Sequence, residues 1–332
     1  MTNLSLLGTA SYLPERVVTN DFFGESDNVM FRGSRERRHA HPDESAAEMI
    51  FKATNKLCER LNISKLTDVG IILCNVTLLD MPFMGVGASV AKLLGAKPEL
   101  ILDVHNAGCI SFIYMMRIAK PLLETTRTKT ALICNVQNTA GPIFGHHDNI
   151  KRPQSAIPGD GCGVGLFALS DISPVESIVT YAYGEYADDM KLISDEGAHW
   201  HAPRKLSLHL NFDERKIIKI IFRGNKLVPS VIREACQEAN VRPSDADILI
   251  TNQPNPFFLR NWREALEISE CRQVHTFDEH GNTFGAAIPI SLERAHDRGM
   301  LKKESKILLG GFSHAGDYAA AAVLTWHKGQ QA

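Results

Sequence analysis

The sequence lacks the cysteine pairs on which disulfide frameworks and zinc sites depend. Its seven cysteines are an odd number, and no two of them form a C-x-x-C pair. This pattern argues against a disulfide scaffold and against a zinc site. Cys58, Cys74 and Cys134 lie in apolar helix or strand patterns, so we expect them to be buried filler residues.

The sequence also has little net charge and no long apolar run. A formal net charge of −2 gives no broad electrostatic attraction toward nucleic acid or an anionic membrane. A run of about 18 apolar residues would indicate a membrane-spanning helix, and neither such a run nor a signal-peptide pattern is present. The sequence therefore predicts a cytoplasmic protein that binds neither nucleic acid nor membrane.

Patterns that would hold a resident cofactor or metal ion are missing as well. The glycine-rich segment 159–165 leads directly into a predicted strand, whereas a dinucleotide-binding loop leads into a helix. His146 and His147 are adjacent, a spacing poorly suited to one metal ion, so we expect exposed loop residues. We therefore predict no metal and no bound cofactor.

Short apolar segments alternate with longer amphipathic segments along the 332 residues. A chain of this length favours two packed halves, and the alternation predicts a layered α/β fold. The predicted strands are 4–8, 69–74, 101–104, 130–136, 163–168, 177–183, 247–251, 306–311 and 319–326. The predicted helices are 45–61, 85–94, 110–123, 226–239, 256–266 and 286–298.

A weak internal repeat supports this organisation. Each half contains a helix, then D-V-G-I-I-L-C-N or D-A-D-I-L-I-T-N, then another helix. We therefore expect two duplicated halves, 1–172 and 173–332, with the active site between them. The segment 183–223 is polar and has little periodicity, so we expect it to form a cap on the substrate side.

The segment 101–114 combines a strand, a tight turn of small residues and a helix, with Cys109 at the start of the helix. Free N–H groups and the helix dipole at such a position favour the thiolate, which predicts a lowered pKa and a nucleophilic thiol. A buried structural cysteine is the alternative that this pattern leaves open.

Five segments together resemble the ketoacyl-acyl carrier protein synthase III family of the thiolase superfamily. They are 7–20, 33–38, 101–114, 159–163 and 281–289, and they span nearly the whole chain in the family's order. The resemblance implies a thiolase-like five-layered α-β-α-β-α fold and a homodimer. It also implies an acyl-enzyme intermediate on Cys109.

One departure from the family pattern concerns the second half of the reaction. Asn252 stands where the family normally carries a histidine, whereas Asn282 matches the family's asparagine. In the condensing enzymes this histidine–asparagine pair donates hydrogen bonds to the malonyl thioester carbonyl. Because an amide cannot take up a proton near neutral pH, the departure disfavours ordinary decarboxylative condensation.

Another group must then act as the base. His280 lies in a loop that the family places over the nucleophile, and Asp317 lies in the final loop. We predict a Cys109–His280–Asp317 triad, which resembles a branch of the family that transfers acyl groups to hydroxyl or amine acceptors. The resemblance assigns the oxyanion donors to the N–H groups of Cys109 and Gly316. His314 is the alternative base and partner of Asp317, and it also counts among the substrate-binding candidates.

The resemblance also bears on the acyl donor and the partner subunit. The tryptophan that stacks on adenine in coenzyme A-using members is absent; Phe31 offers only a partial stacking face, while Arg152 matches the partner arginine. This favours an acyl carrier protein as donor, with coenzyme A as the alternative. Arg260 and Arg263 are expected to meet the acidic carrier. Phe83 matches a phenylalanine that enters the partner's acyl pocket.

These features favour an acyltransferase that works by a ping-pong route. Cys109 would accept an acyl group from a thioester and pass it to a hydroxyl or amine of a small molecule, in specialised metabolism. One rival function is carbon–carbon bond formation, with Asn252 and Asn282 polarising the extender thioester. A second rival is a non-catalytic subunit of a heterodimeric synthase.

Overall fold

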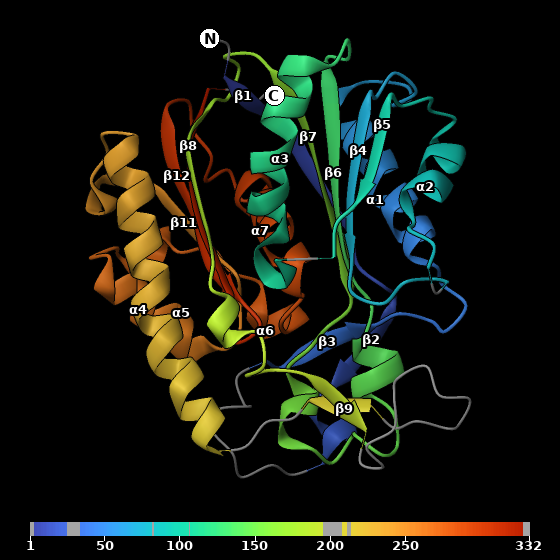
Figure 1. Ribbon diagram of the computed structural model, residues 1–332, viewed down its shortest axis with the longest axis vertical. Coiled ribbons are helices and arrows are strands. Elements are labelled where there is room, and N and C mark those ends of the chain that lie inside the picture. The colour runs from blue at the N-terminus through green and yellow to red at the C-terminus, as the bar shows by residue number, and fades with distance from the viewer. Residues whose placement is uncertain are drawn as a thin grey trace.

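The computed structural model describes residues 3–24, 34–81, 83–105, 107–194, 208–210 and 214–327. Two β-sheets lie face to face with helices between them and helices on both outer faces, which gives five layers (Figure 1). The predicted five-layered α-β-α-β-α fold is confirmed. None of the helices in the described ranges is long and apolar enough to cross a membrane.

The first sheet comes entirely from the N-terminal half of the chain. Its strand order is β1-β7-β6-β4-β5. Strand β7 is antiparallel to both of its neighbours, whereas β6, β4 and β5 run parallel. The bounds are β1 Leu4–Tyr12, β4 Ile71–Val76, β5 Leu100–Asp103, β6 Thr130–Gln137 and β7 Gly161–Leu169.

The second sheet repeats the order and the directions of the first sheet without its edge strand. Its order is β8-β13-β12-β11, with β13 antiparallel to both neighbours and β12 parallel to β11. The bounds are β8 Val175–Ala182, β11 Ile248–Thr251, β12 Ser305–Ser313 and β13 Tyr318–Trp326. This correspondence supports the duplication, while the division between residues 172 and 173 stays a prediction.

Two helices fill the layer between the sheets (Figure 1). The side chains of Phe112, Ile113, Met115 and Met116 on the first of them are fully buried, since that helix meets both sheets. Apolar residues around the whole circumference are typical of a helix enclosed on all sides. The central helices are α3 Ser111–Thr125 and α7 Ala287–Asp297.

The outer helices each cover one sheet. Helices α1 Ala46–Leu61 and α2 Gly87–Leu94 cover the first sheet, and α4 Glu214–Glu238 and α5 Pro256–Ala265 cover the second. Helix α1 begins where predicted because Ser45 and Glu48 form a reciprocal capping box. The buried positions predicted for Cys58, Cys74 and Cys134 are confirmed.

The first half of α4 is the main error in the predicted elements. The helix begins at Glu214, twelve residues before the predicted start at 226. Its first turns alternate basic residues with isoleucines, and Ile217, Ile220 and Ile221 line a pocket, although Ile220 and Ile221 also pack against the core of this half. Part of the predicted cap at 183–223 is therefore helical. The described remainder of the cap includes a small hairpin of β9 Leu192–Ser194 and β10 Leu208–Leu210.

Short elements complete the description around the site. Strands β2 Arg16–Thr19 and β3 Glu36–His39 pair antiparallel below the first sheet, and the one-turn helix α6 Phe277–His280 packs against β3. These elements lie at the lower end of the molecule in Figure 1, toward the cap hairpin.

Candidate active site

Cys109 lies in a short 3₁₀ turn, Gly108–Ile110, which leads directly into the central helix α3. The chain approaches the end of β12 closely here. A Cβ atom on Gly108 would lie only 2.6 Å from Oγ of Ser313 and 2.9 Å from Nε2 of His314. Gly108 also has a φ of 29°, so glycine is required both for space and for backbone conformation.

The electrostatic surroundings of Cys109 differ from the prediction. Burial raises the pKa of the thiol to about 12, against the opposing effects of the His314 N–H, the Asn252 side chain and the Cys109 N–H. The predicted lowering of the pKa is therefore wrong. The reason is that apolar surroundings destabilise the thiolate more than the nearby donors stabilise it. The resting residue is a neutral thiol and needs a base to become nucleophilic.

His314 and Asp317 form a pair beside this thiol. Nδ1 of His314 lies 3.1 and 3.0 Å from the two carboxylate oxygens of Asp317. A carboxylate only accepts hydrogen bonds, so Nδ1 of the neutral ring donates and Nε2 keeps a free lone pair. Because Nε2 lies against Gly108, that lone pair is available next to the nucleophile. His314 has a φ of 47°, a strained conformation of the kind found at functional sites.

His280 does not join this group, contrary to the predicted triad. It is buried at the end of α6, and its Nε2 lies 3.3 Å from a guanidinium nitrogen of Arg294 on α7. Burial and the Arg294 charge lower the pKa of His280 to about 4. His280 is not among the residues that line the pocket around Cys109. The proposed pairing with Asp317 is wrong because α6 directs this side chain toward α7.

The two asparagines both line the pocket but are held differently. The Asn252 amide donates to the Phe312 carbonyl at 2.9 Å and accepts from the Phe312 N–H at 3.2 Å. Its remaining N–H lies against the Cys109 thiol and lowers its pKa. The Asn282 side-chain oxygen accepts from the Phe284 N–H at 3.1 Å. Within the described ranges, the Asn282 amide nitrogen has no protein partner, so its donors face the pocket.

The oxyanion assignment to Gly316 also needs correction. The Gly316 N–H donates to the Ser313 carbonyl at 2.8 Å, which closes the turn and uses this donor. The backbone donors that face the thiol are those of Cys109 and His314. The N–H groups of Cys109 and His314 therefore lie beside the thiol, whereas that of Gly316 is engaged within the turn.

A pocket of about 430 Å³ opens above Cys109. Its walls are mainly apolar, as expected for a site that receives an acyl chain. The apolar lining includes Ile143, Phe144, Leu192, Ile217, Ile220 and Phe258. His105, which is exposed just after the edge strand β5, also lines the pocket.

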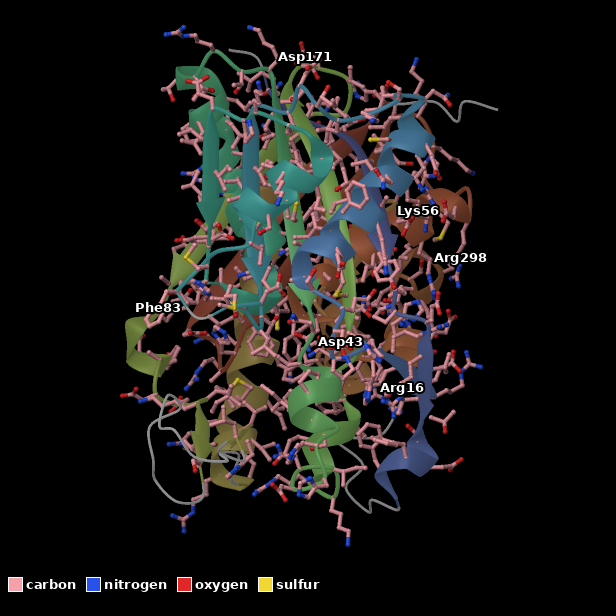
Figure 2. All side chains as sticks on the ribbon, turned by 90° about the vertical axis from the view of Figure 1, so that its right-hand side faces the viewer. Arg16, Asp43, Lys56, Phe83, Asp171 and Arg298 are labelled. Atoms are coloured by element: carbon pink, nitrogen blue, oxygen red, sulfur yellow. The ribbon has the colours of Figure 1, made fainter. Side chains whose placement is uncertain are left out.

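The remaining predicted substrate residues lie in different places. Phe31 lies outside the described residues. Arg152 is half-buried, and it is absent from the pocket lining, whereas Gln154 contributes to it. Phe83 is fully exposed with a φ of 70°, and Figure 2 shows it at the edge of the molecule.

The two arginines predicted to contact a carrier protein differ in exposure. Arg260 is exposed on α5, with its guanidinium 5.8 Å from the centre of the Phe257 ring. The side chain of Arg263 is only 15% exposed and lies 3.6 Å from Glu264. Arg260 is thus available to a partner, and Arg263 is largely covered.

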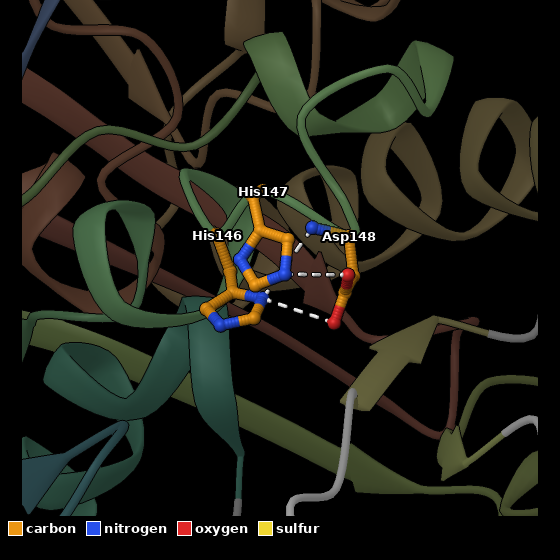
Figure 3. A group of neighbouring side chains, drawn as sticks. All are labelled: His146, His147 and Asp148. Atoms are coloured by element: carbon orange, nitrogen blue, oxygen red, sulfur yellow. Dashed lines mark hydrogen bonds and ion pairs between the residues drawn. The ribbon is translucent and has the colours of Figure 1, made fainter.

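One cluster of potential metal ligands occurs in the described part of the chain. His146, His147 and Asp148 are all exposed, and their ligand atoms lie within 4.8 Å of one another (Figure 3). The arrangement is explained by contacts within one turn: Nε2 of His147 lies 2.9 Å from Asp148, and Nδ1 of His146 accepts from the Asp148 N–H at 3.4 Å. The three residues occupy an exposed loop, as expected.

A buried polar chain beneath the nucleophile escaped the sequence analysis. Asn135 donates to Ser111 at 2.6 Å, Ser111 donates to Asn75 at 2.9 Å, and Asn75 donates to the Val104 carbonyl at 2.6 Å. Ser111 begins α3, so this chain anchors the turn that carries Cys109. A usable signal exists, because Asn75 and Asn135 follow identical cysteines in two apolar strands and pair in register.

Comparisons with known proteins agree with this architecture. Residues 236–326 match the family model described as 3-oxoacyl-[acyl-carrier-protein (ACP)] synthase III C terminal. A β-ketoacyl-[acyl-carrier-protein] synthase III of Pectobacterium atrosepticum is 28% identical over 324 residues, covering 96% of this chain and 98% of that protein. The solved structure of a β-ketoacyl-[acyl carrier protein] synthase III from Thermus thermophilus has a TM-score of 0.82 at 27% identity, covering 97% and 99% of the two chains.

A more distant structure supports the fold alone. The priming β-ketosynthase of a polyketide biosynthetic pathway has a TM-score of 0.84 at 21% identity, covering 98% of this chain and 96% of that chain.

The duplicated five-layered fold, with a cysteine at the start of a central helix and asparagines around it, defines a thiolase-type enzyme. Within that class, residues 236–326 match the C-terminal model of the ketoacyl-acyl carrier protein synthase III family, and nearly the whole chain is similar to proteins of that family. This family comprises transferases of the condensing class that act on acyl thioesters.

Proposed function

We propose that this protein is an acyltransferase that forms an acyl thioester on Cys109 and passes the acyl group to a hydroxyl or amine. The observation that carries the proposal is the His314–Asp317 pair beside the nucleophile. Such a pair supplies a base with a fixed tautomer, which the amide of Asn252 cannot supply. We assign the function to the specialised rather than the housekeeping members of the family.

In the first half-reaction, Nε2 of His314 takes the proton of the Cys109 thiol as the sulfur attacks the donor carbonyl. The base is needed because burial raises the pKa of this thiol to about 12. The N–H groups of Cys109 and His314 stabilise the charge that develops at the reacting centre. The imidazolium then returns the proton to the departing thiol, which leaves an acyl thioester on Cys109.

In the second half-reaction, the acceptor hydroxyl or amine loses its proton to Nε2 of His314 and attacks the acyl carbonyl. The carbon–sulfur bond breaks, Cys109 leaves as thiolate and regains the proton from the imidazolium. Asp317 stabilises the imidazolium in both half-reactions and keeps its own proton state. The products are an ester or amide and the free enzyme.

Decarboxylative carbon–carbon condensation is the second candidate function. The open amide nitrogen of Asn282 favours it, since this donor could polarise an extender thioester. Asn252 favours it less, because one of its amide N–H groups and its amide oxygen are engaged by the backbone of Phe312. The Asn252 side chain therefore already binds the backbone of β12 and the Cys109 thiol, and is less available to an extender thioester.

We further propose an acyl carrier protein as the donor, on the evidence of the surface beside the pocket. Ile218, Phe222 and Phe257 are exposed on α4 and α5, next to the isoleucines of α4 that line the pocket. Four cations on the same helices have no carboxylate partner within the described ranges. They are Arg215, Lys219, Lys226 and Arg260. An apolar patch with a basic rim suits an acidic amphipathic partner.

A homodimer with Phe83 near the partner's pocket is part of the same proposal. Met81, Phe83 and Met84 are exposed by 62%, 100% and 65% in one short segment. Such a concentration of apolar side chains is typical of a surface that a partner covers. A second copy of the chain is the occupant that the family resemblance suggests.

The central experiment separates the three candidate functions. The protein is incubated with acyl carrier protein or coenzyme A thioesters, and the mass of the Cys109 peptide is followed. Alcohols, amines or malonyl thioester are then added. We expect an acyl adduct that alcohols or amines discharge without release of carbon dioxide. Carbon dioxide release with a β-keto product would establish the condensing function, and no adduct with any donor would favour a non-catalytic subunit.

Variants of the two histidines test the base. His314→Ala should slow acylation of Cys109 by roughly 10²- to 10³-fold, the usual contribution of a general base. His280→Gln is the matched control, and it should change the rate by less than about threefold because His280 lies outside the pocket. If His280→Gln slows the acylation of Cys109 and His314→Ala does not, the base is His280 and the assignment to His314 is wrong.

A further inference from the structure

Arg223 on α4 contacts three residues in two separate segments of the protein. Its guanidinium donates to the Ala315 carbonyl and lies 2.8 Å from the Asp189 carboxylate. The guanidinium carbon also lies 3.4 Å from the centre of the Tyr186 ring. Its side chain is only 14% exposed. A stacked, paired and nearly buried arginine of this kind holds its neighbours in one geometry.

One of these segments is the catalytic turn, Ser313–Asp317. Arg223 holds the Ala315 carbonyl from one side, while the Tyr183 N–H donates to the Asp317 carbonyl at 2.6 Å from the other. Between them, Gly316 has a φ of 100°, and a Cβ there would lie 2.5 Å from Cδ of Arg223. The aliphatic part of Arg223 therefore occupies the space that glycine leaves open, and it defines the path of the turn.

The other segment belongs to the cap over the pocket. Asp189, which pairs with Arg223, directly precedes Met190, Lys191 and Leu192, all of which line the pocket, and Tyr186 lies one turn earlier in the same segment. The ion pair is well shielded, because the exposures of the two side chains are only 14% and 30%. A substrate that contacts Met190–Leu192 thus touches a segment tied through one side chain to the catalytic turn.

We propose that Arg223 is a positioning residue that fixes the His314–Asp317 pair against the cap. The inference rests on the proposed role of His314. Arg223 does not touch the substrate. It sets the position of the turn, and through the turn the distance between Nε2 of His314 and the Cys109 thiol. A shift of about 1 Å in a reacting group is enough to cost up to ~10²-fold in rate.

The test uses the reactivity of Cys109 toward iodoacetamide, measured by peptide mapping near neutral pH. This small probe needs no acyl donor, so it reports the base and thiol alone. Cys271 is exposed and serves as an internal reference in the same molecule. We expect Arg223→Ala to slow Cys109 alkylation about tenfold and leave Cys271 unchanged. Arg223→Lys, which keeps the charge without the two-pronged geometry, should give an intermediate rate.

Two further variants distinguish positioning from a general loss of structure. Arg233→Ala removes an arginine of the same helix that donates to a backbone carbonyl, Ala265, away from the pocket. It should leave the Cys109 rate unchanged. In a His314→Ala background, Arg223→Ala should have less than about a twofold further effect, since its action passes through His314.

The possible outcomes separate this inference from the proposed function. If His314→Ala slows the alkylation of Cys109 and Arg223→Ala does not, Arg223 has no positioning role, while His314 keeps its proposed role as the base. Equal effects of Arg223→Ala in both backgrounds would indicate a structural role and also overturn it. If His314→Ala leaves the rate of Cys109 alkylation unchanged, both the proposed base and the proposed positioning role are refuted.

Discussion

The thiol of Cys109 and the imidazole of His314 come from opposite halves of the duplicated fold. Their approach depends on Gly108, which leaves room for the ring, and on the positive φ of His314. The pair is complementary, because burial keeps the thiol protonated and the Asp317 carboxylate keeps Nε2 of His314 free to accept. Neither residue would be reactive in this way without the other.

The spacing of His314 and Asp317 in the sequence already indicates that the two side chains can pair. His314 and Asp317 are three residues apart in one loop, so a short turn is enough to bring them together. His280 and Asp317 are joined by a longer path through the helix α7 and the strand β12. The predicted triad joined the right types of residue, but it chose a histidine that the adjacent helix directs elsewhere.

The buried state of His280 predicts how stability depends on pH. Burial lowers the pKa of His280 to about 4, whereas the unfolded residue titrates near 6.5. Between these values the unfolded chain binds more protons, so the free energy of unfolding falls as the pH falls from 6.5 toward 4. His280→Gln should remove about 3 kcal/mol of this loss between pH 7.5 and pH 4, measured by urea denaturation.

His147→Gln provides the control for that measurement, because His147 is exposed in the loop of Figure 3. It should leave the pH dependence unchanged. His39 is also buried, with its pKa lowered by burial to about 4, and it should account for a remaining loss in His280→Gln. An unaltered pH profile in His280→Gln would contradict the buried neutral state.

At the scale of elements, α4 serves three functions with three faces. One face packs on the second sheet, one lines the pocket with isoleucines, and one is exposed with Phe222 and several cations. The periodicity of residues 226–239 predicted the packed face alone. The earlier turns were missed because their apolar residues face a pocket, and their pattern does not match a helix with one buried stripe.

The exposed face of α4 gives a prediction about the acyl donor. Lys226→Glu should raise the KM for an acyl carrier protein several-fold and leave the KM for a coenzyme A thioester unchanged, because only the protein donor needs the surface. The comparison requires steady-state rates with both donors at low and high salt. The difference should shrink as salt screens the contact.

Lys303→Glu is the matched control, since Lys303 is exposed before the start of β12, at the end opposite the catalytic turn. Equal changes in the KM of both donors, or an effect of Lys303→Glu as large as that of Lys226→Glu, would refute the docking surface. Arg263 is not a useful test position, because its side chain is largely covered.

At the scale of the whole molecule, the two halves share one central layer, and the pocket lies where both halves contribute. The N-terminal half supplies Cys109, and the C-terminal half supplies His314, Asn252 and Asn282. The buried core between the sheets contains residues from both halves. Neither half therefore contains a complete site.

The exposed apolar segment around Phe83 predicts the oligomeric state. Sedimentation equilibrium should give about twice the chain mass of 36.7 kDa, and Phe83→Asp should weaken the association at least tenfold by burying a charge in the interface. Phe222→Asp, at another exposed phenylalanine, should leave the association unchanged. A monomeric wild-type protein would rule out this arrangement.

The sequence by itself determined the features that depend on local pattern. Alternating apolar segments specified the layered fold, the repeated D-x-x-I motifs indicated the duplication, and small residues around Cys109 marked the nucleophile turn. Spacing and context also argued against a disulfide framework and against a dinucleotide-binding loop. Each of these conclusions follows from the periodicity of the backbone and from the few residues next to one position.

Only the tertiary structure decided which histidine lies beside Cys109 and how acidic the thiol is. Which histidine lies beside Cys109 depends on a distance between the two halves, which the packing of the turn Gly108–Ile110 against the end of β12 sets. The pKa of Cys109 depends on the balance between burial, which raises it, and three donors that lower it, of which those of His314 and Asn252 come from distant segments. Long-range proximity and solvent exclusion are properties of the packed molecule, and no local pattern encodes them.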